Sequence, residues 1–151
     1  MFGNRTALGF GHGALATLAM SAVMIVGTVT GLSPMPAPIP EAIVGMVLDG
    51  APTPVLVAAA VVAHLGYGGT FGALLARFAP PVTPAKGLAL GVALWAVMGV
   101  VVLPLLGWGL FGTAITPRVA VATLLLHLVY GSVLGWSLDR GAAGRTAVTA
   151  A

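Results

Sequence analysis

"AHLGYGGTFG", residues 63–72, lies within a run of valine, alanine and leucine that is long enough to cross a membrane. A helix needs about 20 mostly apolar residues to span the hydrocarbon core. One histidine and four glycines are unusual there, because an ionisable side chain is costly to bury in lipid and glycine is a weak helix former. The stretch therefore raises one question: whether His64 and Tyr67 hold helices together or carry chemistry.

The composition of the chain is typical of an integral membrane protein. Of its 151 residues, 59% are hydrophobic and 6% are charged, and the mean hydropathy is +1.10. Soluble domains carry about 25% charged residues. The length predicts a single transmembrane domain, residues 1–151. The net charge of +3 includes no basic cluster, so nucleic acid is not an expected partner. The absence of cysteine excludes disulfides and cysteine-ligated metals.

Four stretches without a charged residue predict four membrane-spanning helices. They cover approximately residues 11–32, 55–76, 87–106 and 119–138. Basic residues concentrate in loops on the cytoplasmic side of a membrane. Five of the six basic residues fall on one side of the four-span arrangement: Arg5, Arg77, Lys86, Arg140 and Arg145. We therefore predict a multi-pass protein of the inner (cytoplasmic) membrane, with both termini in the cytoplasm and the lipid bilayer as its first partner.

The two outward loops carry further signals. Pro40 suits the first position of a helix, Glu41 suits its positive end, and Gly50 can end it. These residues predict a short interfacial helix at about 40–49, outside the membrane. Trp108 and Phe111, in the second outward loop, are residues typical of the aromatic belt at a membrane interface.

The opening stretch recurs near the C-terminus. Residues 53–77 align with residues 116–140 without a gap, which places both tyrosines and two of the three histidines in register. Spans 1 and 3 share a weaker pattern, in which Gly9, Gly13 and Met20 match Gly87, Gly91 and Met98. The pattern predicts two copies of a helical hairpin, repeat units 9–77 and 87–140. Because both hairpins start and end on the same side, they form a parallel repeat about an axis along the membrane normal.

Each copy contains a helical stripe of polar and small residues at spacings of three and four. The candidate site residues are those of the two stripes: His64, Tyr67, Gly68, Gly72, His127, Tyr130, Gly131 and Gly135. Glycines four residues apart allow close approach of helix backbones. We therefore predict an all-α, four-helix transmembrane bundle with the two stripes facing inward.

Three functions are compatible with paired histidines near the middle of two spans. The leading hypothesis is a non-catalytic accessory or scaffold subunit, in which the stripes are packing contacts with other membrane subunits or with a second copy. The alternative is a small channel or transporter for protons or a small solute, with the histidine and tyrosine faces lining its path. The third is a b-type haem subunit ligated by His64 and His127. No catalytic or metal motif is found, and no cofactor is expected unless the haem hypothesis holds.

The H-x-x-Y-G-x-x-x-G stretch at residues 127–135, with its earlier copy at 64–72, resembles small uncharacterised prokaryotic membrane proteins of the YagU-like kind. The resemblance covers about residues 8–140. It implies a four-span inner-membrane protein without an assigned activity. No catalytic residue is therefore carried over, and the expectation is a protein that is not an enzyme.

Overall fold

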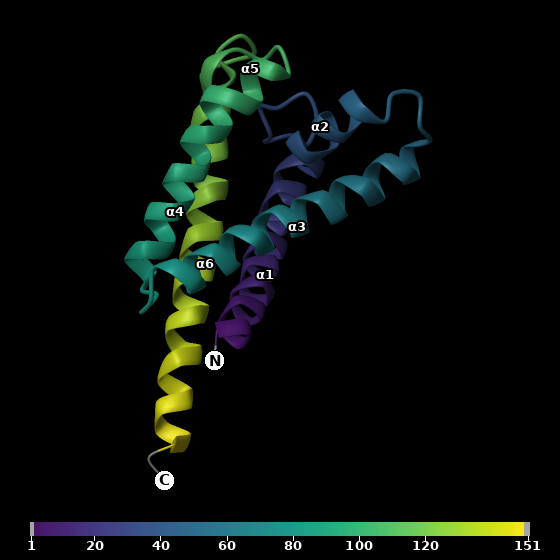
Figure 1. The fold of residues 1–151 in the computed structure, drawn as a ribbon. Coiled ribbons are helices and arrows are strands. Elements are labelled where there is room, and N and C mark those ends of the chain that lie inside the picture. The colour runs from purple at the N-terminus through teal and green to yellow at the C-terminus, as the bar shows by residue number, and fades with distance from the viewer. Residues whose placement is uncertain (1, 150–151) are drawn as a thin grey trace.

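The computed structural model describes residues 2–149, with side chains for residues 4–141. The described chain is all-helical, as predicted (Figure 1). Four of its helical segments are long and apolar enough to cross a membrane, with lengths of 22–26 residues. These segments are Asn4–Val29, Thr53–Phe78, Pro84–Leu105 and Arg118–Gly141.

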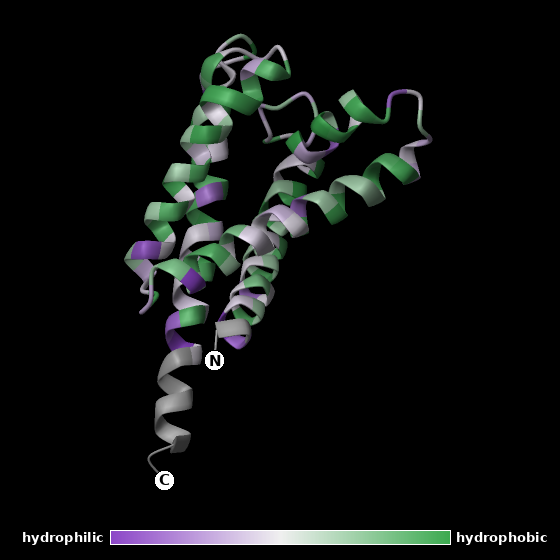
Figure 2. Cartoon of the chain, in the orientation of Figure 1, coloured by the Kyte–Doolittle hydropathy of each residue, from purple (hydrophilic) through white to green (hydrophobic). Residues whose placement is uncertain are grey.

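The first, second and fourth spans belong to the long helices α1 (Phe2–Val29), α3 (Thr53–Phe78) and α6 (Arg118–Thr149). Hydrophobic residues cover these helices along most of their length, as Figure 2 shows. The predicted first span, residues 11–32, differs from α1 at both ends. The helix ends at Val29 because Gly31 takes a left-handed backbone conformation, with a φ of 73°.

The third span is helical but not uniformly α-helical. It consists of α4 (Pro84–Val97), a π-helical turn (Met98–Val102) and α5 (Leu103–Leu105). In the π-helical turn the N–H of Leu103 donates to the carbonyl of Met98, five residues earlier. Proline at position 104 has no N–H to donate, and its ring clashes with the carbonyl four residues before it. The wider π-helical turn directly precedes this proline. The predicted span at residues 87–106 is therefore helical but contains an irregular turn that the sequence analysis does not predict.

Two short helices lie at one end of the molecule, which we call the α2 end. The helix α2 (Ile39–Val47) corresponds to the helix predicted at about 40–49, and it begins with proline within its first turn. A 3-10 helix, η2 (Leu110–Gly112), precedes α6. Phe111 of η2 packs on Trp95 of α4, with ring centroids 4.7 Å apart. Phe111 thus packs back onto the third span, and its place at a membrane interface stays a prediction.

The four spans pair as two hairpins. α1 packs along α3, α4 packs along α6, and the hairpins meet mainly where α1 contacts α6. Figure 1 shows that α3 crosses α1 and diverges from it towards the α2 end, where α2 lies between them. The N-terminus of α1 and the loop from α3 to α4 lie at the opposite end.

Glycines make the contact surface within each hairpin, which we call the glycine seam. A Cβ atom built on Gly9 would lie 2.6 Å from the carbonyl oxygen of Gly72. In the second hairpin, a Cβ on Gly131 would lie 2.5 Å from the carbonyl oxygen of Gly87. Side chains at these positions would collide with backbone, so only glycine allows the helices to approach this closely.

The two seams differ in register. Gly9 faces Gly72, but its predicted counterpart Gly87 faces Gly131, which matches Gly68. Relative to the partner helix, Gly87 therefore takes the place of Gly13, which faces the carbonyl of Gly68. The duplication itself stays a prediction. If the hairpins are copies, their seams are offset by one helical turn.

Candidate functional site

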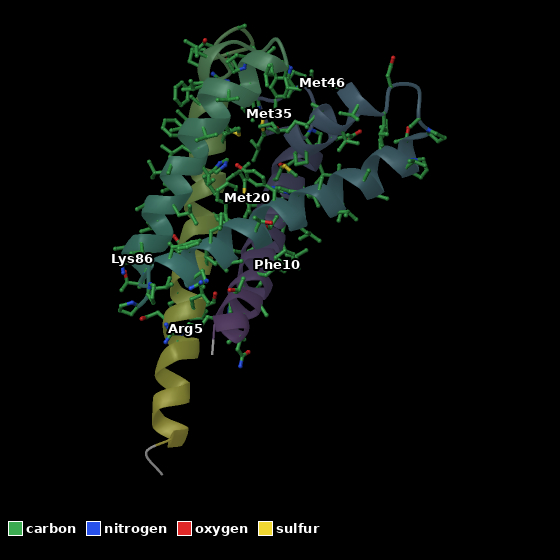
Figure 3. The ribbon with its side chains drawn as sticks, viewed as in Figure 1. Arg5, Phe10, Met20, Met35, Met46 and Lys86 are labelled. Carbon is green, nitrogen blue, oxygen red and sulfur yellow. The ribbon has the colours of Figure 1, made fainter. Side chains whose placement is uncertain are left out.

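A partly open cavity of about 220 Å³ lies between the two hairpins, and residues of α2 form part of its lining. Both stripe histidines line it, one from α3 and one from α6. Its lining also includes two hydroxyl residues, Tyr67 and Thr123, and four thioethers: Met20, Met24, Met35 and Met98. Figure 3 shows Met20 and Met35 in the space between the hairpins, whereas Met46 lies on α2 away from it. The two histidines thus line the same cavity, one from each hairpin.

Each histidine is oriented by a hydrogen bond at Nδ1. His127 Nδ1 lies 2.8 Å from the carbonyl oxygen of Thr123. Because a carbonyl can only accept, this nitrogen carries the proton and donates. His64 Nδ1 lies 3.2 Å from the hydroxyl oxygen of Ser21 on α1, and this hydroxyl can either accept a hydrogen bond from Nδ1 or donate one to it.

The other ring nitrogen, Nε2, makes no hydrogen bond to any described residue for either His64 or His127. An imidazole that donates through Nδ1 presents a lone pair at Nε2. A histidine fixed by a hydrogen bond from one nitrogen, with the other nitrogen available, is the usual arrangement of a ligating histidine. His127 is therefore arranged to accept a ligand or a proton through Nε2, and His64 is arranged in the same way when its Nδ1 donates to Ser21.

A second, smaller cavity of about 30 Å³ adjoins the first. The two cavities share His64, His127, Met20 and Tyr67. A space that holds one water needs about 10–15 Å³ on this measure, so the smaller cavity suits one or two water-sized occupants. It is the smaller of the two cavities that both histidines line.

The two tyrosines of the stripes differ in their surroundings. Tyr130 is 2% exposed, and its hydroxyl donates to the carbonyl oxygen of Gly68 at 2.7 Å, which links α6 to α3. Tyr67 is 46% exposed and packs on Phe71, with ring centroids 4.8 Å apart. Tyr67 nevertheless lines both cavities, so it lies at their edge with part of its ring exposed, whereas Tyr130 is enclosed.

The four glycines of the stripes serve the seams. Gly68 and Gly72 lie against α1, and Gly131 and Gly135 lie against α4. Each stripe therefore divides into two parts: its glycines bring helices together, while its histidine reaches the cavity. Within each stripe, the packing hypothesis therefore concerns the glycines, and the ligand hypothesis concerns the histidine.

The methionines of the cavity were not among the residues that sequence reasoning selected for a site. Met20 and Met24 lie four residues apart, on one face of α1, and this spacing can be recognised from the sequence. Met35 and Met98 carry no such signal, since one lies in the loop before α2 and the other begins the π-helical turn. Only the tertiary arrangement brings the four together.

The size of the cavity bears on the haem hypothesis. Pockets for small molecules typically measure about 300–1,000 Å³, and the larger cavity measures about 220 Å³. The geometry favours a ligand smaller than a porphyrin.

Comparison with known proteins adds a family but no activity. No curated protein and no solved structure matches the chain. A family model described as "Family of unknown function (DUF6789)" matches residues 3–148, nearly the whole chain. The predicted resemblance to an uncharacterised family is confirmed in that sense, whereas the YagU-like relationship stays a prediction. The chain belongs to the DUF6789 family.

Proposed function

We propose that this protein is an integral membrane subunit that binds a small ligand in the cavity between its two hairpins. One observation carries the proposal: His64 and His127 reach the same cavity from different hairpins, each with Nδ1 hydrogen-bonded and Nε2 without a described partner. Mostly apolar concave sites with a few convergent polar groups are the usual form of a small-molecule site.

The role that we propose is binding and not catalysis. The described lining contains no carboxylate, lysine or arginine, and Thr123, its one aliphatic hydroxyl, already donates within its own helix. A nucleophile paired with a general base is the common basis of covalent catalysis. The lining offers two imidazoles without such a pair. An accessory subunit of a larger membrane assembly, or of a homo-oligomer, suits a protein that holds a ligand and leaves its chemistry to a partner.

Transport is the second candidate, because the cavity is partly open and its two histidines can exchange protons or coordinate a solute. A transporter would need a path from this cavity to both sides of the membrane. The cavity lies towards the α2 end, so the glycine seams stand between it and the opposite end. Transport therefore requires the hairpins to move against each other at the contact of α1 with α6.

The proposed orientation follows the basic residues. Lys86 lies at the end opposite α2, where its ammonium group donates to the carbonyls of Ala79 and Pro81 at 3.0 and 2.8 Å. Arg77 and Arg140 lie near the ends of α3 and of the fourth span at the same end of the molecule. The positive-inside rule supports a cytoplasmic location for this end, and the inner membrane as the location of the protein.

Native mass spectrometry of the protein released from nanodiscs tests the binding role. We expect wild-type protein to retain a bound ligand that is lost in Ala63→Phe, since Ala63 lines the cavity and a phenyl ring would fill it. Ala58→Phe is the matched control, because Ala58 lies exposed on the same helix outside the cavity lining. Equal ligand retention by the two variants would contradict the proposal.

A further inference from the structure

We propose that the ligand is a soft monovalent metal ion, Cu(I), bound by the Nε2 atoms of His64 and His127 and the thioether of Met20. This inference rests on the proposed binding function and specifies its ligand class. The three side chains come from α3, α6 and α1, and all three line both the 30 Å³ cavity and the larger one. A site of this kind exists only when the two hairpins are packed together.

The distribution of methionine is the first argument. Four of the six methionines of the chain line the larger cavity, although leucine is far commoner than methionine. Among the described residues of that lining, Leu126 is the only leucine. Isoleucine and valine also line this cavity, so its lining combines thioethers with aliphatic side chains. The concentration of four methionines in one lining supports a ligand that interacts with thioethers.

The chemistry of the donors is the second argument. Thioethers are soft ligands that favour Cu(I), and imidazole also binds copper. Mg²⁺, Ca²⁺ and Mn²⁺ prefer carboxylate and carbonyl oxygens. No carboxylate is found among the described lining residues of either cavity. The donor set consequently discriminates against hard divalent ions.

The charge of the ion is the third argument. A site within the membrane-spanning region is poorly hydrated, so the free-energy cost of a bound ion rises steeply with its charge. The proposed ligands are all neutral, and the described cavity linings contain no anionic side chain to compensate a second positive charge. A monovalent ion is therefore favoured over Zn²⁺ or Cu²⁺.

The geometry of the histidines is the fourth argument. The Thr123 carbonyl fixes one ring from within α6, and the Ser21 hydroxyl fixes the other from the neighbouring α1. Such outer contacts hold a ligating histidine in the correct tautomer and orientation. Methionine could fill an irregular gap without any metal, but that role would not require two imidazoles that line the same small cavity.

Metal titration of the full chain in nanodiscs tests the assignment. Protein is mixed anaerobically with Cu(I) held in its bicinchoninate complex, and transfer of the metal to the protein is followed by the loss of that complex's colour. We expect one Cu(I) per chain and an X-ray absorption spectrum with both nitrogen and sulfur neighbours. Silver(I), which is also soft and monovalent, should compete, and Zn²⁺ should not.

Met20→Leu is the decisive variant, because it removes the sulfur while nearly conserving volume. We expect it to weaken Cu(I) binding at least tenfold. Met46→Leu is the matched control, since Met46 is 60% exposed on α2, and it should bind as the wild type does. His64→Gln and His127→Gln should each reduce the nitrogen contribution to the spectrum by about half, and the double variant should abolish it. Thermal unfolding of Met20→Leu within a few degrees of wild type shows that the variant is folded.

Several outcomes would overturn the copper assignment. Equal Cu(I) affinity of Met20→Leu and Met46→Leu would remove the thioether from the site. A wild-type protein that binds no Cu(I) but retains another ligand, lost in Ala63→Phe, would refute copper and leave the binding function standing. A wild-type protein that retains neither Cu(I) nor any other ligand would refute both the copper assignment and the binding function. A Soret band in the purified protein would replace the ion by haem.

Discussion

Replacing Gly72 by alanine is expected to destabilise the protein by about 3 kcal/mol, near the upper end of the usual cost of overpacking. A Cβ at this position would lie 2.7 Å from the Cα of Gly13 and 3.0 Å from its nitrogen. Carbon atoms in contact are normally 3.5–4.0 Å apart, so α1 and α3 would have to separate by about 1 Å. Both neighbours are backbone atoms, so no side-chain rotation relieves the collision.

Gly66→Ala is the matched control on the same helix. A Cβ on Gly66 meets nothing within 4 Å. Alanine is the better helix former, so this variant should gain about 0.5–1 kcal/mol. The same chemical change therefore acts in opposite directions at two positions six residues apart, and the pair should differ by about 3–4 kcal/mol.

Reversible unfolding in mixed micelles, with increasing SDS and tryptophan fluorescence as the signal, measures both variants against wild type. The three tryptophans of the chain provide the signal without a label. If Gly72→Ala and Gly66→Ala agree within about 0.5 kcal/mol, the glycine seam is not a close backbone contact. Stabilisation by both variants would show that only helix propensity matters at Gly72.

Three further predictions concern single contacts and orientation. Tyr130→Phe removes a 2.7 Å hydrogen bond between helices and should cost about 0.6–1.5 kcal/mol in the same unfolding assay, whereas Tyr67→Phe should cost less than about 0.5 kcal/mol. Trp95→Phe loses the 3.1 Å indole hydrogen bond to α6 and should lower stability by about 1 kcal/mol; an unchanged midpoint would show that this bond contributes nothing. In this cysteine-free chain, Asp49→Cys should react with an impermeant maleimide in intact cells and Ala85→Cys should not; the reverse pattern would invert the proposed orientation.

The four spans and the glycine contacts could be predicted because they depend on local sequence. Span length follows from the thickness of the hydrocarbon core, and glycines spaced by four mark a face where helices approach. Gly68, Gly72, Gly131 and Gly135 all lie on the seams. The partner of each seam glycine was less predictable, since Gly9 and Gly87 look equivalent in sequence but face different turns.

The cavity could not be predicted, because it depends on how far α3 diverges from α1 and on how the two hairpins pack together. The angle at which α3 leaves α1 exposes Tyr67 while its counterpart Tyr130 is buried. The same divergence lets Met35, from the loop before α2, share a space with Met98, from the π-helical turn. Periodicity within one span carries no information on either contact.

The two seams also bear on the order in which the protein assembles. Each seam joins spans that follow one another along the chain, so its contacts are short-range in sequence and entropically cheap to close. The first helical pair can form while the ribosome is still synthesising the second. The contact of α1 with α6 needs nearly the whole chain, so it forms last. The cavity lined by methionine and histidine therefore forms only in the final docking step, and no partly synthesised chain contains it.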